Sequence, residues 1–72
     1  MHTHTLKFSP EIGKTYTCYL QDVALYSATV EKIQGCWATV TVVQPVPGKF
    51  EQQYRSGQQF DIKVAMYEFE EK

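Results

Sequence analysis

Apolar and polar side chains alternate residue by residue along most of this chain, and that pattern constrains the fold more than any other feature. Successive side chains of a β-strand point to opposite faces, so period-two alternation with many β-branched residues predicts strands. The alternation is clearest over residues 14–20, 24–32, 36–43 and 58–70, and helical periodicity is absent almost everywhere. A chain of 72 residues is short, so residues 1–72 are expected to fold as one small all-β domain.

Prolines and weak patterning indicate where these strands end. Residues 44–48 contain two prolines and are expected to form a loop, because proline cannot donate to an interior strand ladder. Residues 49–55 predict a short strand, although their pattern is weak. Residues 3–8 alternate, so the first ten residues (1–10) are expected to form an edge strand or a flexible arm. Five or six strands with short turns predict a small barrel, whose closure removes exposed sheet edges.

The segments 24–32 and 36–43 predict a β-hairpin, and its register decides which side chains face each other. A three-residue loop that ends at Gly35 pairs apolar residues throughout, and glycine readily adopts the left-handed conformation needed there. A two-residue turn at positions 34 and 35 would instead mix apolar and polar partners. The preferred register pairs Val30 with Ala38, Ala28 with Val40 and Tyr26 with Val42. Its outer face carries Leu25, Ser27, Thr29, Glu31, Trp37, Thr39, Thr41 and Val43.

In each predicted strand, the alternate residues that face inward predict the core. Its expected members are Tyr16, Cys18, Leu20, Tyr26, Ala28, Val30, Ala38, Val40, Val42, Phe60, Ile62 and Val64, with Met66 in the same phase. Both cysteines, Cys18 and Cys36, fall within predicted strands, where a free cysteine behaves as a small buried hydrophobe. They are therefore expected to be buried and reduced. The pair also lacks the additional ligands of a zinc site.

Charge and motifs argue against several classes of function. Seven basic and eight acidic residues give a net charge of −1 and an isoelectric point near 6.0, which disfavours non-specific nucleic-acid binding. No apolar run approaches the roughly 20 residues that span a bilayer, and the N-terminus lacks the order of a secretory signal. A cytoplasmic protein without membrane contact is expected. His2 and His4 are far in sequence from any partner for catalysis, so neither an enzyme nor a bound metal or cofactor is predicted.

Residues 26–33 read Tyr-Ser-Ala-Thr-Val-Glu-Lys-Ile and resemble the Tudor domains, a branch of the SH3-like barrels. Gly13, Tyr19 and Asp22 fall close to the family's glycine, strand-ending aromatic residue and short acidic loop. The resemblance covers roughly residues 12–53. It implies an SH3-like barrel of five or six strands.

The Tudor resemblance also implies a binding site. Tudor domains hold methylated arginine or lysine in a cage of aromatic rings, through cation–π contacts. Tyr19 and Tyr26 match the first two cage positions, whereas the other two fall near Val43 and Val46. Because the alternation points Tyr26 inward, a packing role for this tyrosine competes with the cage.

A second resemblance competes with the first. Residues 30–40 and 57–64 are similar to the S1-type OB-fold, with a Val-x-x-Ile segment, a glycine-aromatic segment and a closing alternating strand. An OB-fold barrel is therefore the alternative architecture. It implies that Trp37 stands near the aromatic residue that stacks on RNA bases.

Aromatic residues make up 14% of the chain, and a barrel this small cannot bury all of them. Trp37 is expected on the outer face of its hairpin, and Tyr67 and Phe69 on that of the last strand. With Tyr19, they form a predicted contact surface centred on Trp37, as exposed aromatic patches often mark protein or nucleic-acid contacts.

The sequence thus predicts a small non-catalytic binding module. The first hypothesis is a protein-interaction adaptor that binds a protein or peptide through an aromatic surface or an exposed strand edge. The alternative is a single-stranded RNA- or DNA-binding domain, in which Trp37 and tyrosines stack on bases. Four basic residues would then contact phosphates: Lys32, Lys49, Arg55 and Lys63.

Overall fold

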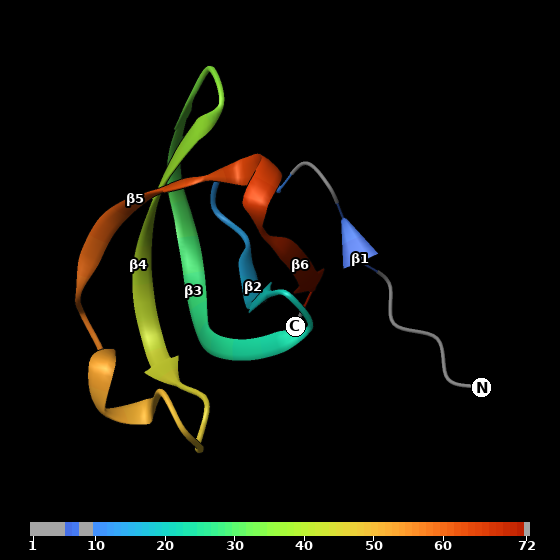
Figure 1. Ribbon diagram of the computed structural model, residues 1–72. Coiled ribbons are helices and arrows are strands. Elements are labelled where there is room, and N and C mark those ends of the chain that lie inside the picture. Colours follow the sequence, from blue (N-terminus) through green and yellow to red (C-terminus); the bar gives the residue numbers. More distant parts are fainter. Residues whose placement is uncertain (1–5, 8–9, 72) are drawn as a thin grey trace.

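A computed structural model describes residues 6–7 and 10–71 (Figure 1). The strands are β1 (Leu6–Lys7), β2 (Thr15–Leu20), β3 (Val23–Gln34), β4 (Trp37–Pro45), β5 (Gln59–Lys63) and β6 (Glu68–Glu71). Two short 3₁₀-helices complete the fold: η1 (Glu51–Gln53) and η2 (Val64–Met66). No α-helix occurs in these residues, so the predicted all-β class is confirmed.

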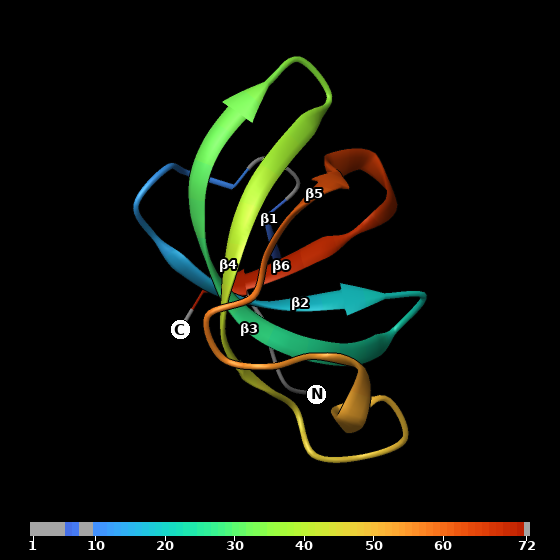
Figure 2. The same cartoon turned by 90° about the vertical axis from the view of Figure 1, so that its left-hand side faces the viewer.

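The strands form one antiparallel sheet in the order β1-β6-β2-β3-β4-β5. Strands β2 to β5 follow each other as a simple meander, and the last strand of the chain returns to lie beside β2. The sheet curls into a small barrel-like fold (Figure 2). Within the segment predicted as an edge strand or flexible arm, Leu6–Lys7 pairs with β6, and the rest of residues 3–8 lies outside the described residues.

The β3–β4 hairpin has a different register from the predicted one. Its turn contains two residues, Gly35 and Cys36, so that Gln34 pairs with Trp37. Gly35 has a φ of +61°, which fits the first central position of a type II′ turn. A bulge at Glu31 then shifts the pairing, and Val30 lies opposite Val40 instead of Ala38. Because a bulge adds one residue to one strand, it restores apolar partners without the predicted three-residue loop.

A second irregularity in β3 corrects the predicted outer face. The register shifts again between Ser27 and Ala28, close to the bend of β3 in Figure 1. Leu25 and Ser27 are buried, as are Tyr26 and Ala28. The prediction that Leu25 and Ser27 face outward is therefore wrong. Strict alternation fails here because the bent strand is enclosed on both faces.

Residues 58–70 form two strands instead of the single predicted strand. The 3₁₀-helix η2 separates β5 from β6 and changes the phase of the side chains. Met66, predicted in the inward phase, is 60% exposed, whereas Phe69, predicted outside, is completely buried. The expected strand over residues 49–55 is also wrong. Here η1 forms instead, and the Glu51 N–H donates to the carbonyl of Gly48.

The buried core agrees with most of the predicted set. It contains Tyr16, Cys18, Leu25, Tyr26, Ala28, Val30, Ala38, Val40, Val42, Ile62 and Phe69. Leu20, Phe60 and Val64 are partly buried against it. Cys18 is buried and Cys36 is exposed, and both are free thiols. The predicted burial of Cys36 is wrong because this residue lies in the hairpin turn.

Candidate binding face

The structure confirms that Trp37 lies on the surface, with 48% of its area exposed. It is the first residue of β4 and pairs with Gln34 on one side and Lys63 on the other. No ring contact joins Trp37 to another aromatic residue in the part of the chain that the structure describes. Trp37 is therefore an isolated exposed ring.

The aromatic surface predicted around Trp37 does not form as expected. Phe69 is buried and packs edge-on against Tyr16, with ring centroids 5.7 Å apart. Tyr19 lies on β2, where its hydroxyl donates a 2.7 Å hydrogen bond to a carboxylate oxygen of Glu70. That hydrogen bond, together with partial burial, raises the pKa of Tyr19. Phe69 is thus removed from the predicted contact surface, and Tyr19 is engaged within the sheet.

A different group of aromatic rings comes together around Tyr26. The ring centroids of Tyr26 and Tyr54 are 4.6 Å apart, and those of Tyr26 and Phe60 are 5.6 Å apart with nearly perpendicular planes. Tyr54 and Phe60 also contact each other at 6.1 Å. Tyr26 is completely buried and supports the other two, which are only partly buried. Tyr26 therefore lies beneath the other two rings and is not an exposed contact residue. This corrects its predicted place among the binding residues.

Three separate elements position these rings. Tyr26 comes from the bent part of β3, Phe60 comes from β5, and Tyr54 follows η1 directly. The η1 turn is closed by hydrogen bonds from the N–H of Gln53 to Phe50 and from that of Tyr54 to Glu51. This turn therefore fixes the path of the chain that brings the ring of Tyr54 over Tyr26.

The hydroxyl of Tyr26 is buried and has no hydrogen-bond partner among the described residues. The hydroxyl of Tyr67 lies nearby without completing such a bond. Burial is the main cause that raises the pKa of Tyr26, and the proximity of Cys18 and Tyr67 adds to it. Burial and Tyr67 likewise raise the pKa of Tyr54. Tyr67 is partly buried against the same core and contacts Phe69, with ring centroids 6.4 Å apart.

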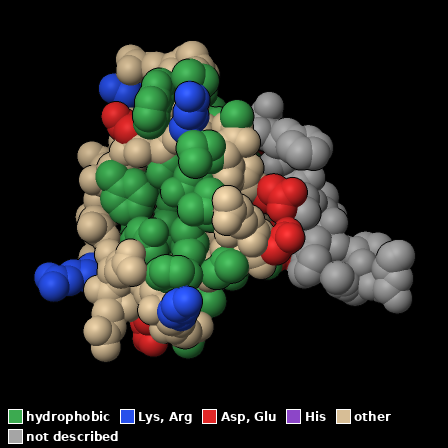
Figure 3. All heavy atoms as spheres, viewed as in Figure 1, with side chains coloured by type: hydrophobic (Ala, Val, Ile, Leu, Met, Phe, Trp, Pro, Cys, Tyr) green, Lys and Arg blue, Asp and Glu red, His purple; other side chains and the backbone are tan. Residues whose placement is uncertain are grey.

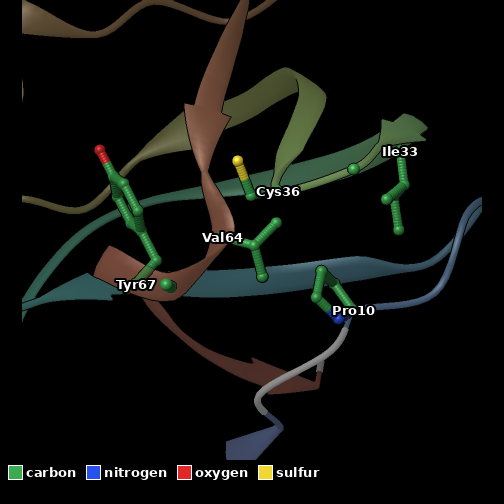
Figure 4. Close-up of a pocket in the computed structure, with 7 residues that line it drawn as sticks. Pro10, Ile33, Cys36, Val64 and Tyr67 are labelled. Carbon is green, nitrogen blue, oxygen red and sulfur yellow. The ribbon is translucent and has the colours of Figure 1, made fainter.

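Two hollows border the partly buried aromatic residues Tyr54 and Tyr67. One, of about 280 Å³, lies beside Tyr54 and is lined by apolar residues of β2, β3 and the loop before η1, including Leu20, Val23, Leu25 and Phe50. The other, of about 450 Å³, lies beside Tyr67, and Figure 4 shows Cys36, Val64 and Pro10 around it. Hydrophobic side chains gather in the middle of the surface seen in Figure 3. We call the half-buried rings Phe50, Tyr54, Phe60 and Tyr67 the aromatic face.

The basic residues predicted for nucleic-acid contact are exposed, but they do not form one strip. Lys49 and Arg55 flank η1, and the Lys49 ammonium lies 5.7 Å from the centroid of the Phe50 ring. Lys32 lies near the tip of the β3–β4 hairpin, at the opposite end of the molecule in Figure 1.

Sequence reasoning missed Phe50, Tyr54 and Phe60 as members of a candidate site. The Tudor-like cage positions near Val43 and Val46 hold no aromatic ring, whereas Tyr54 and Phe60 lie against Tyr26. The sequence contained a signal for these residues, since three aromatic residues occur within residues 50–60, a segment with weak strand alternation.

The described residues contain no group of three or more metal-ligating side chains, and His2 and His4 lie outside them. Within the same residues, no helix is long and apolar enough to cross a membrane. Comparisons of the chain with models of protein families, with curated proteins and with solved structures give no match. The fold alone defines a small antiparallel all-β protein.

Proposed function

We propose that this protein is a non-catalytic interaction module that binds an extended peptide segment of a partner protein on the aromatic face. The observation that carries the proposal is the packing of Tyr54 and Phe60 on buried Tyr26, while both rings remain partly exposed. Rings held in this way present apolar area at a small further cost in side-chain entropy. Aromatic residues of this kind commonly dominate the energetics of protein interfaces.

The two hollows support a peptide as the ligand. Tyr67 lines one hollow, and Phe50 and Tyr54 line the other. An extended peptide places successive side chains on opposite sides, so it can fill hollows with some side chains while others remain in solvent. The tyrosine hydroxyls also offer donors and acceptors to the peptide backbone.

The strand order supports an SH3-like arrangement over an OB-fold. Strands β2 to β5 form a meander, a 3₁₀-helix precedes the last strand, and that strand returns beside β2. An OB-fold is a Greek-key barrel, which requires a different strand order. We therefore propose the SH3-like arrangement, with the aromatic face between η1, β5 and η2.

The test is a selection of linear peptides from a random phage-displayed library on the purified chain, followed by titration of a synthetic selected peptide. We expect Tyr54→Ala to weaken binding by about 2 kcal/mol, the size typical of an interface hot spot. Trp37→Ala is the matched control, because Trp37 is also an exposed aromatic residue but lies outside the aromatic face. Equal loss in both variants, or loss only in Trp37→Ala, would refute the assignment of this face.

The alternative ligand is single-stranded nucleic acid, favoured by one observation: exposed Trp37 lies directly across from Lys63. A fluorescein-labelled oligothymidylate tests it. Binding that falls steeply with salt and is lost in Trp37→Ala would support stacking and phosphate contacts at this position. Absence of such binding, with peptide binding intact, supports the aromatic face.

A further inference from the structure

Strand β5 lies at one end of the sheet, with β4 as its strand partner and no strand on its other side among residues 6–7 and 10–71. Gln59, Asp61 and Lys63 are all exposed. An unpaired strand edge presents backbone N–H and C=O groups that can pair with another strand. The β5 edge is therefore available for addition of a further strand.

The hydrogen bonds to β4 show which backbone groups face this edge. The N–H of Val42 donates to Gln58 at one end of the pairing, and the N–H of Val64 donates to Cys36 at the other. Hydrogen-bonded pairs alternate along an antiparallel ladder, so Phe60 and Ile62 direct their backbone groups toward β4. The backbone groups of Gln59, Asp61 and Lys63 consequently point away from the sheet, and none has a described partner.

The side chains along this edge are complementary in charge to the same edge of a second copy of the chain. Asp61 and Lys63 have opposite charges and lie two residues apart, on the same face of β5. If a second copy pairs antiparallel and centred on Ile62, Asp61 of each copy lies opposite Lys63 of the other. We propose that two copies of this chain associate through their β5 edges in this register, as a two-fold dimer with a continuous sheet.

The charges also disfavour the neighbouring registers. Pairing centred on Asp61 places the two Asp61 carboxylates opposite each other, which is destabilising. Pairing centred on Phe60 places Asp61 opposite uncharged Gln59 and forms no ion pair. The register centred on Ile62 satisfies both charges in each copy and brings the two apolar Ile62 residues together on the inner face.

This arrangement places Trp37 beside the interface. Trp37 pairs with Lys63 on the outer face of the sheet, and Thr39 donates a hydrogen bond to the carboxylate of Asp61. In the dimer, Trp37 and Lys63 of one copy therefore lie in one row with Asp61 and Thr39 of the other copy. Dimer formation should change the fluorescence of Trp37, the single tryptophan of the chain.

Charge reversal tests the register. The dissociation constant of the purified full chain is measured by sedimentation equilibrium, with Trp37 emission followed over the same concentrations. Asp61→Lys and Lys63→Asp each create two like-charge pairs in the dimer, and each should weaken association about tenfold or more. The double variant Asp61→Lys/Lys63→Asp restores opposite charges and should return the dissociation constant close to that of the original chain.

Two controls separate this edge from other effects. Lys49→Glu reverses an exposed charge outside β5 and should leave association unchanged. Amide exchange gives a backbone readout, because the N–H groups of Asp61 and Lys63 should become protected as concentration rises, whereas those of Phe60 and Ile62 are protected throughout. Tyr54→Ala should leave the dimer intact, so failure of the peptide-binding proposal is distinguishable from failure of this one.

Three outcomes would overturn the dimer. They are a monomer at concentrations up to about 1 mM, single reversals that leave association unchanged, and a double variant as weak as the single ones. A change in circular dichroism of a single variant would show misfolding. In that case the amide-exchange experiment on the original chain decides, since unprotected Asp61 and Lys63 amides at high concentration exclude pairing through β5.

Discussion

The ring of Tyr54 packs on the ring of Tyr26, with centroids 4.6 Å apart and planes inclined by 53°. Tyr26 is completely buried, so its position is fixed by the core, and it supports a ring that remains partly exposed. This contact links the stability of the fold to the shape of the aromatic face. It also encloses a hydroxyl that has no hydrogen-bond partner among the described residues.

Removal of the Tyr26 hydroxyl should therefore not destabilise the protein. A buried polar group without a partner costs about 1–3 kcal/mol, so Tyr26→Phe should leave the free energy of unfolding unchanged or raise it by about 1 kcal/mol. Tyr16→Phe is the matched control, because Tyr16 is equally buried but its hydroxyl accepts a 2.8 Å hydrogen bond from the N–H of Glu11. That variant should lose about 1 kcal/mol. Urea denaturation of both measures the contrast, and equal losses would contradict it.

The hairpin turn should depend on the backbone freedom of Gly35. Its φ of +61° is unfavourable for residues with a Cβ atom, although a Cβ placed there meets no atom within 4 Å. The cost of substitution thus comes from the backbone alone. Gly35→Val should lower the free energy of unfolding by about 1–2 kcal/mol, and Gly35→Asn by less, because asparagine tolerates this conformation. If thermal denaturation gives the two variants the same stability, the turn adopts another conformation.

The two thiols should differ in reactivity. Cys36 is exposed in the turn, whereas Cys18 is buried and its burial raises the pKa of the thiol to about 12. Because the thiolate is the reactive form, Cys36 should react rapidly with Ellman's reagent and Cys18 only slowly. After unfolding, both should react at once. Rapid reaction of both thiols in the native protein would show that the barrel opens on the time scale of the assay.

Stability should fall in alkaline solution, and Cys18 should account for part of the loss. The pKa of Cys18 rises from 9.0 to about 12 in the folded protein, so between these values the unfolded chain releases a proton that the folded chain retains. The folded state therefore keeps its full stability below pH 9 and loses up to about 1.4 kcal/mol per pH unit above it. Cys18→Ala should be less stable at pH 8 but show a shallower decline from pH 9 to 11. Urea denaturation across this range tests it, and parallel declines would exclude the thiol as a cause.

The sequence was sufficient to predict that this chain is all-β and to assign most of its core. Alternation determines which face of a strand is apolar, so Tyr16, Cys18 and Val40 were correctly assigned to the interior. The exposure of Trp37 follows from the same alternation. The positive φ of Gly35 was also predicted, although for a three-residue loop in place of the observed two-residue turn. These features depend on the residues near them in the chain.

The pairing of strands and the candidate site were decided only by the tertiary structure. A bulge at Glu31 moves Val40 opposite Val30 without placing a polar side chain in the core, so alternation alone cannot distinguish the two registers. The 3₁₀-helix η2 moves Phe69 from the predicted outer face into the core, because the chain must turn there from β5 to a place beside β2. Tyr26, Tyr54 and Phe60 meet through contacts between three distant elements. Such contacts depend on how the sheet curls, and no local pattern of residues specifies that curvature.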